Sequence, residues 1–247
     1  TGAELEKFKK QAESLTTIRI GDEQIVNSVT NIVEAFKSVG GARPELLEDA
    51  DALAEVTKQA IVLSKASGLD LNASVEALTT GLGQFQLEAT ASKDIINELA
   101  AGARAGASEI PDTTAALKDF GTTAASSNIK TSESIALIQV LADRQLKGAE
   151  AGTQLRNILA KLASADVLPR TALAELKEAG VNIDVLRDKS LPLEVRLTEL
   201  GKLSGNTTAL VKAFGVENLA ASQILAEGTD KYKDFLKQIQ GTNEAYR

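Results

Sequence analysis

The stretch from residue 131 to residue 163 limits the possible fold more than any other part of the chain. A segment whose apolar residues would lie almost all round a helix, Thr131 to Gln145, leads into a glycine-containing turn and then into the alanine-rich segment LKGAEAGTQLRNILAKLA, Leu146 to Ala163. Two segments of helical period joined by a short turn predict a helical hairpin. The sequence therefore favours a fold built from closely packed helices.

A similar pattern occurs earlier in the chain. Subtracting 60 from each number places Ile138 on Leu78, Leu155 on Ile95 and Leu159 on Leu99. One interpretation is a duplicated helical hairpin, residues 69–103 and 129–163. The other is a chance alignment of two amphipathic hairpins, because alanine matches carry little weight in so alanine-rich a chain.

Composition supports an all-α class. Of the 247 residues, 43% are hydrophobic but only 3% are aromatic, so the core must consist of Leu, Ile, Val and Ala. Good helix formers dominate, and proline occurs only four times. We expect an array of antiparallel helical hairpins with short Gly and Pro turns, either solenoid-like or an irregular bundle.

The expected organisation has three parts. Residues 1–40 form N-terminal helices, residues 41–180 form a core that holds the two hairpins, and residues 181–247 form C-terminal helices. Because the chain begins with Thr1 rather than Met, we expect it to be processed or a fragment of a longer protein.

Local signals suggest where helices begin and end. Gly21 to Gln24 resembles a cap for a helix over residues 25–36, and Asn72 is a candidate N-cap. Gly68 fits the position just past a helix end. Phe214 and Gly215 are expected to interrupt the helical pattern.

Several kinds of chemistry are excluded. The chain has no Cys and no His, which argues against a structural zinc site and rules out a Ser-His or Cys-His nucleophile pair. A net charge of −7 argues against nucleic-acid binding. Gly81-Leu82-Gly83 lacks the third glycine of a dinucleotide loop. We therefore expect no enzyme activity, cofactor or metal, and no membrane span, since no apolar run reaches about 20 residues.

Ordered sequence blocks resemble the shared core region of tailed-phage tail tape measure proteins. The blocks are SGLDL (Ser67–Leu71), QFQL (Gln84–Leu87), GAS (Gly106–Ser108), ALKDFG (Ala116–Gly121), NIKTSES (Asn128–Ser134), LKGAEAGTQLRNIL (Leu146–Leu159), ALAELKEAGVNI (Ala172–Ile183), LPLEVRLTEL (Leu191–Leu200) and LVKAFGVENLAASQIL (Leu210–Leu225). In this family a small residue and a Gly commonly precede the Lys-Gly turn. Here Arg144 and Gln145 stand there, which implies a longer, more polar helix end and an altered turn.

The candidate site residues form a structural motif around that turn. Lys147 and Gly148 form the turn, while Gly152 is expected to let a neighbouring helix approach closely. Thr153 and Arg156 follow on the same helix; for Arg156 we favour a structural role over partner recognition. Other members of the set are Gly68, Phe214 and Gly215.

The resemblance implies a structural role in the virion. Such a protein would set tail length while the tube polymerises and leave the tube before genome delivery. It would occupy the tail tube lumen, and the host cytoplasm during assembly. Implied partners are the tail tube, tail assembly chaperones, baseplate or tail-tip proteins, and further copies of itself. The alternative is a helical-repeat protein–protein adaptor or scaffold. A peptidoglycan hydrolase domain would have to lie outside this segment.

Overall fold

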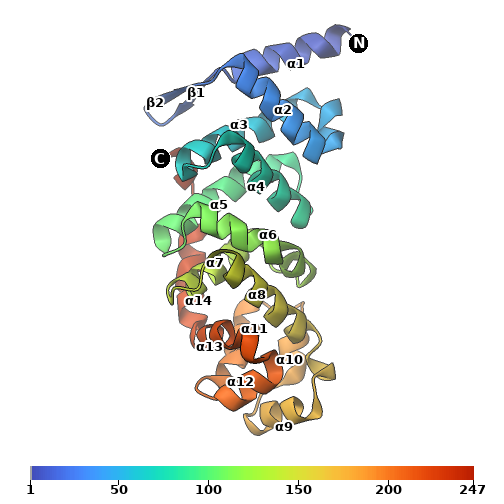
Figure 1. Ribbon diagram of the computed structural model, residues 1–247, viewed down its shortest axis with the longest axis vertical. Helices are drawn as coiled ribbons and strands as arrows, with labels where there is room; N and C mark the ends of the chain where they lie inside the picture. Colours follow the sequence, from blue (N-terminus) through green and yellow to red (C-terminus); the bar gives the residue numbers. More distant parts are fainter. Residues whose placement is uncertain (1) are drawn as a thin grey trace. The chain divides into compact units, whose positions relative to one another are not determined.

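The computed structural model describes residues 2–247, and helices dominate it throughout. These residues form fourteen α-helices, six short 3-10 helices and one two-stranded ribbon (Figure 1). The predicted all-α fold is confirmed. Within the described residues, none of the helices is both long enough and apolar enough to cross a membrane.

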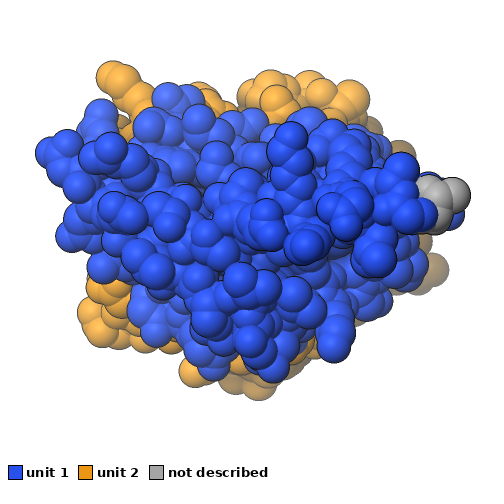
Figure 2. Space-filling view, turned by 90° about the horizontal axis from the view of Figure 1, so that it is seen from above, with its two compact units in different colours: residues 1–101, 241–247 blue, residues 102–240 orange. Residues whose placement is uncertain are grey.

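The chain divides into two compact units (Figure 2). Unit 1 contains residues 1–101 and 241–247, and unit 2 contains residues 102–240. The expected division into residues 1–40, 41–180 and 181–247 stays a prediction. The end of the chain belongs to unit 1 because Tyr246 donates a hydrogen bond from its hydroxyl to Gln59 Oε1 at 2.5 Å, and the backbone N–H of Ala245 donates to Asn97 Oδ1 at 3.0 Å.

Unit 1 is built on three central helices. Helix α3 packs against α4, and α4 also packs against α2, so Leu53, Leu63 and Leu78 are fully enclosed. Asp49 begins α3 by accepting hydrogen bonds from the backbone N–H groups of Asp51 and Ala52. The elements of unit 1 are α1 (Gly2–Ser14), β1 (Thr17–Ile20), β2 (Glu23–Val26), α2 (Val29–Ala42), η1 (Pro44–Glu48), α3 (Ala50–Ser67), α4 (Leu71–Gln84), η2 (Ala89–Ala91), most of α5 (Ser92–Ala105), and η6 (Glu244–Tyr246).

The ribbon corrects one local prediction. The segment expected to cap and begin a helix at residues 21–25 instead forms an antiparallel hairpin, with Ile18 opposite Ile25. Gly21 has a φ of +56° at the two-residue turn, a conformation that favours a hairpin. Helix α2 begins later, at Val29, where the Ser28 side chain accepts a hydrogen bond from the N–H of Asn31.

Unit 2 surrounds one almost fully buried helix. Every residue of α7 from Ser134 to Ala142 is buried. Helix α8 packs along α6, α14 packs against α7, and α12 packs against α9. The elements are α6 (Ile110–Ser126), α7 (Thr131–Ala142), α8 (Gly148–Ala163), η3 (Ala165–Val167), α9 (Arg170–Glu178), α10 (Ile183–Arg187), α11 (Leu193–Leu200), η4 (Gly201–Leu203), α12 (Thr207–Phe214), η5 (Val216–Asn218), α13 (Leu219–Glu227) and α14 (Thr229–Ile239).

One type of helix end recurs in unit 2. Asn128, Gln145 and Gly180, which lie two or three residues beyond the end of a helix, have φ values of +58°, +66° and +74°. The next residue is apolar and buried in each case, and its N–H bonds back to the preceding helix; these residues are Ile129, Leu146 and Val181. This pattern is the Schellman motif, which ends a helix sharply.

The helix ends differ from the local predictions in two places. Helix α7 ends at Ala142, so the expected longer helix up to Gln145 is wrong, because Gln145 adopts the left-handed conformation itself. At α4 the N-cap is Asp70 rather than Asn72, since the Asp70 carboxylate accepts a hydrogen bond from the N–H of Ala73 at 2.7 Å. Gly68 ends α3 with a φ of +72°.

The helix boundaries are compatible with the expected duplication. Helices α3 and α6 both end before a left-handed residue, at Gly68 and Asn128, whose numbers differ by 60. The four aligned side chains of the second helix in each hairpin are all buried; they are Ile95, Leu99, Leu155 and Leu159. Duplication itself stays a prediction, because equal burial is also expected of two unrelated amphipathic helices.

Candidate functional site

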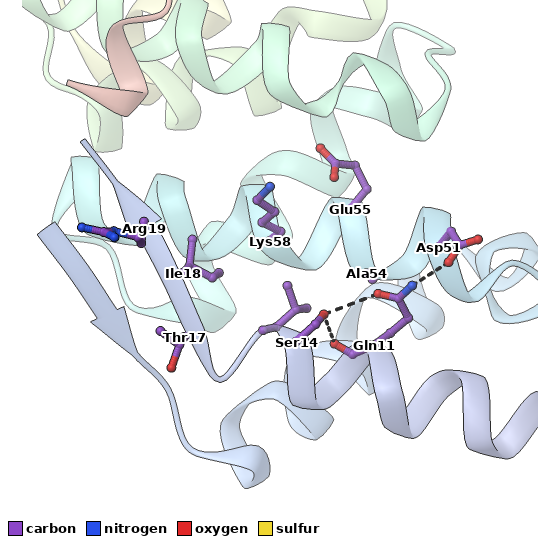
Figure 3. Close-up of a pocket in the computed structure, with 10 residues that line it drawn as sticks. Gln11, Ser14, Thr17, Ile18, Arg19, Asp51, Ala54, Glu55 and Lys58 are labelled. Carbon is purple, nitrogen blue, oxygen red and sulfur yellow. Dashed lines mark hydrogen bonds between the residues drawn. The ribbon is translucent and has the colours of Figure 1, made fainter. Parts of the chain in front are cut away.

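A polar pocket in unit 1 is held together by its own charged groups. It has a volume of about 440 Å³, and its lining residues come from α1, β1, α3 and the α1–β1 junction (Figure 3). Gln11 Nε2 donates to Asp51 Oδ1 at 2.6 Å, and Lys7 Nζ lies 2.9 Å from Asp51 Oδ2. The hydrogen bond from Lys7 lowers the pKa of Asp51. These contacts attach α1 to α3. The charged side chains around the pocket are both acidic and basic, and they do not form a catalytic pair.

The more informative site lies in unit 2, where polar side chains of α8 bind the segment after α12. Gln154 Oε1 accepts a hydrogen bond from the N–H of Ala221 at 3.0 Å. Asn157 Nδ2 donates to Asn218 Oδ1, also at 3.0 Å. We call these four residues, Gln154, Asn157, Asn218 and Ala221, the α8 clamp. Gln154 and Asn218 are buried, so these bonds satisfy groups that water does not reach.

Side chains at the same contact donate hydrogen bonds to the last carbonyl group of α12. Asn218 Nδ2 donates to the carbonyl oxygen of Phe214 at 2.7 Å, and Lys161 Nζ donates to that oxygen at 2.5 Å. Gly215 follows in a left-handed conformation with a φ of +88°. A cation beside the last carbonyl of a helix is favourable because the helix C-terminus carries partial negative charge. The predicted break at Phe214 and Gly215 is therefore part of the surface on which α8 packs.

A second polar contact joins the start of α6 to the middle of α7. The buried Gln139 side chain donates from Nε2 to Ser108 O and accepts at Oε1 from Ser108 N, both at 2.9 Å. A Cβ at Gly106 would lie 2.2 Å from Gln139 Oε1, so any side chain there would displace the amide. The GAS block, Gly106–Ser108, therefore packs around the side chain of Gln139, which lies on α7.

A third contact centres on Arg196 of α11, which is 1% exposed. Its Nε donates to Leu186 O at 3.0 Å and its Nη1 to Ser127 O at 3.3 Å, whereas Nη2 is buried without a partner among the described atoms. Burial lowers the pKa of Arg196, while the negative charges of Asp188 and Glu133 oppose that effect. The guanidinium therefore connects the ends of α6 and α10.

The predicted glycines lie at the turn and at a helix contact. Gly148 is the first residue of α8 and has a φ of +61°. A Cβ on Gly152 would lie 2.4 Å from the carbonyl oxygen of Ala116, because α8 and α6 nearly touch there. Thr153 adds a hydroxyl hydrogen bond to Asp119 of α6 at 3.4 Å.

The two predicted charged residues, Lys147 and Arg156, contribute less to the contacts between helices. Lys147 is the N-cap of α8 but makes no side-chain capping bond. Arg156 is exposed, and the described structure records no ion pair or hydrogen bond for it. Gly68 lies in unit 1 and is not part of this site.

Sequence reasoning missed the polar residues that hold the site together: Gln139, Gln154, Asn157, Asn218 and Arg196. Gln139, Gln154, Asn157 and Arg196 lie at helix positions on the apolar face or at its border, and this placement was the available signal. Asn218 lies in η5, just before α13, where the helical period gives no such signal. The described residues contain no cluster of His, Cys, Asp or Glu placed to hold a metal ion. What the geometry provides is cohesion between helices that are distant in the sequence.

These contacts define a structural helical protein, and the comparisons with known proteins place it in a virus particle. The defining sequence pattern of the phage-related minor tail proteins matches residues 9–219. The chain therefore belongs to the phage-related minor tail protein family.

A curated relative gives a more specific likeness. The chain is 27% identical over 234 residues to the tape measure protein of Pneumococcus phage Dp-1. The match covers 92% of this chain but 19% of the relative, so the chain spans about a fifth of that protein's length. No solved structure matches. The predicted resemblance to tail tape measure proteins is confirmed, and so is a structural role in the phage tail.

Proposed function

We propose that this chain is a folded segment of a tape measure protein, which sets tail length during tube assembly and leaves the tube before genome delivery. The family match and the tape measure relative support this role. The observation that carries it is the internal contact between two of the blocks that carry the resemblance, LKGAEAGTQLRNIL and LVKAFGVENLAASQIL, through the α8 clamp. Both halves of this contact lie within the chain, so it holds the fold together without a ligand.

Length control requires a molecule whose extent grows with its residue number. A continuous α-helix rises about 1.5 Å per residue, so extended helical regions can supply that scaling. The described segment is unsuited to it, because its helices fold back on one another. We therefore assign length scaling to extended regions of the longer parent protein that lie outside residues 1–247. To this segment we assign the role of a folded unit that other tail components recognise.

The partners follow from this role. The proposed partners are the tail tube, tail assembly chaperones and baseplate or tail-tip proteins, with several copies of the chain in the tube lumen. Assembly would take place in the host cytoplasm. The net charge of −7 gives the segment an acidic surface, which supports protein partners over nucleic acid.

Deletion of extended regions tests the length role. In-frame deletions in the parent protein that leave residues 1–247 intact should shorten the tails in proportion to the residues removed, as measured in electron micrographs. Deleting α8 should instead prevent tail assembly, because the α8 clamp and the α6 contact would both be lost. Unchanged tail length after the first type of deletion would contradict the proposal and favour an adaptor.

Comparing filled and emptied particles tests the ejection role. Mass spectrometry of purified virions should detect peptides from residues 9–219, and particles that have delivered their genome should have lost them. A tube protein provides the control, since it should remain in both samples. Retention of the chain in emptied particles would overturn this part of the proposal.

A further inference from the structure

The last seven described residues return to unit 1 and lie on two of its helices. We call residues 241–247, which follow α14 and contain η6, the strap (Figure 1). Towards α3, the Tyr246 hydroxyl donates to Gln59 Oε1 at 2.5 Å. Towards α5, the N–H of Ala245 donates to Asn97 Oδ1 at 3.0 Å. The strap therefore connects two helices that precede it by well over a hundred residues in the sequence.

The surface under the strap is polar although it is shielded from water. Gln59 is 1% exposed and Asn97 is 3% exposed. The contacts around them are also polar, since Lys93 Nζ lies 5.2 Å from the centroid of the Tyr246 ring, within range of a cation–π attraction. Of the seven strap residues, all of which are described, only Ala245 is buried. Little apolar surface therefore holds the strap in place.

A segment held in this way can leave without unfolding the helices beneath it. Local opening requires less free energy than global unfolding where few apolar groups are buried. Departure of the strap would expose the amide groups of Gln59 and Asn97 to water, so neither would stay buried without a partner, which is the costly outcome. By contrast, Leu53 and Leu63 of α3 are enclosed by apolar packing and are exposed only when unit 1 unfolds.

The backbone before the strap permits this movement. Helix α14 ends at Ile239, and Gly241 has a φ of +67°. Apart from its chain neighbours, no atom lies within 4 Å of the position that a Cβ on Gly241 would take. A glycine in open space changes its dihedral angles at little steric cost. Gln240 donates from Nε2 to Ser132 Oγ of unit 2 at 3.4 Å, so rotation at Gly241 moves the strap and leaves the end of α14 in place.

We propose that the strap is a reversible latch, predominantly closed on α3 and α5, which opens while units 1 and 2 both stay folded. The docking site takes this chain's own segment 241–247, because Gln59 accepts a phenol hydroxyl and Asn97 accepts a backbone N–H. The chain passes from unit 1 to unit 2 within α5 and returns through the strap. Opening therefore leaves α5 as the connection between the folded units. The latch does not depend on the proposed tail function.

Thiol labelling measures the opening, because the natural chain has no cysteine. Ala245→Cys places a thiol under the closed strap, Arg247→Cys places one on its exposed side, and Ala60→Cys places one in the core of α3. We expect Ala245→Cys to react at least about tenfold more slowly than Arg247→Cys and at least about tenfold faster than Ala60→Cys.

The two reference rates also give the results that would overturn the latch. Labelling of Ala245→Cys at the rate of Arg247→Cys would show that the strap does not dock. Labelling at the rate of Ala60→Cys would show that the strap leaves only when unit 1 unfolds.

Two Tyr→Phe substitutions test the contact with α3. In the Ala245→Cys chain, Tyr246→Phe should speed labelling about three- to tenfold, because it removes one hydrogen bond of the closed strap. Tyr232→Phe is the matched control, since its hydroxyl bonds Glu133 in unit 2 and its loss should leave the labelling rate unchanged. No acceleration by Tyr246→Phe, or equal acceleration by both substitutions, would overturn the proposal.

Hydrogen exchange of the natural chain provides a measurement that needs no cysteine. The N–H of Ala245 should exchange at least about tenfold faster than the N–H groups in the middle of α3 and α7. In the Tyr246→Phe variant, exchange at Ala245 should become faster still, while α3 and α7 keep their protection. Exchange of Ala245 at the same rate as the middle of α3 would overturn the proposal, because the strap would then be a fixed part of the core of unit 1.

Discussion

Gly152 of α8 lies directly against the backbone of Ala116 in α6. A Cβ at Gly152 would be 2.4 Å from the Ala116 carbonyl oxygen and 2.9 Å from its Cα. Both distances are well below van der Waals contact, so the two helices can approach this closely only because residue 152 has no side chain. The contact fixes how α8 lies, and thereby positions the α8 clamp on the segment after α12.

Replacing Gly152 with alanine should destabilise the fold. The added methyl group would force α6 and α8 apart and cost about 1–3 kcal/mol of unfolding free energy. Gly83→Ala is the matched control, since no atom outside the helix backbone lies within 4 Å of a Cβ there, and it should stabilise the exposed end of α4 by up to about 1 kcal/mol. Chemical denaturation measures both. Equal stability of the two variants would contradict the close contact.

Substitutions at the two left-handed residues around the start of α8, Gln145 and Gly148, should change the stability of the fold in opposite directions. Gly148→Val introduces a β-branched side chain at a φ of +61° and should cost more than about 1 kcal/mol. Gln145→Gly relieves a left-handed glutamine at a φ of +66° and should stabilise the fold by about 0.5–1 kcal/mol. Thermal melts of both variants check the signs. A destabilised Gln145→Gly variant would show that the turn is not strained.

Removing the buried guanidinium of Arg196 should lower the stability of the fold far more than removing the exposed guanidinium of Arg156. Arg196→Met leaves the carbonyl groups of Ser127 and Leu186 buried without those donors, and should cost about 2–4 kcal/mol. Arg156→Ala should change stability by less than about 0.5 kcal/mol, because that side chain is exposed. Urea titrations compare the two. A neutral Arg196→Met variant would mean that the arginine does not connect α6 and α10.

The two tyrosines predict an alkaline loss of stability. Burial raises the pKa of Tyr232, and the Glu133 carboxylate, which accepts its hydroxyl hydrogen bond at 3.3 Å, raises it further. Burial also raises the pKa of Tyr246. Since the folded state favours the neutral phenols, this stabilisation is complete below pH about 10 and is lost as pH rises beyond it.

Ultraviolet absorbance follows this effect directly, because the chain has only two tyrosines. The tyrosinate signal should appear together with the loss of helical circular dichroism, and Tyr232→Phe should make unfolding less dependent on pH above about 10. Tyrosines that ionise near pH 10 in a still-helical protein would contradict the burial of both hydroxyls.

Helix positions could largely be predicted from the sequence, because period and end signals are local. Pro44, Pro111 and Gly68 lie at helix ends as their backbone restrictions require. The ribbon was missed although residues 17–20 alternate and a Gly-Asp pair follows. Both signals are typical of a hairpin, but they were outweighed by the acidic residues that also favour a helix start.

The candidate site was only partly predictable because its partners are distant in the sequence. A glycine within an apolar helix indicates a close neighbour, yet nothing local shows that the neighbour of Gly152 is α6 rather than the adjacent α7. Arg196 lies between Leu193 and Leu200 on the buried face of α11, and that position in the sequence could have indicated a buried arginine. Its carbonyl partners are set by tertiary packing and could not be derived from spacing.

Tail length after insertion tests the central claim most directly. Inserting heptads of uninterrupted helical sequence into the parent protein outside residues 1–247 should lengthen the tails by about 1.5 Å for each added residue, and damaged assembly cannot imitate longer tails. The same insertion between α8 and α9 is the control, and should yield no uniformly longer tails because it disturbs a folded unit. Electron micrographs that show a linear increase for the first series would support the account. Tails of unchanged length throughout that series would contradict it.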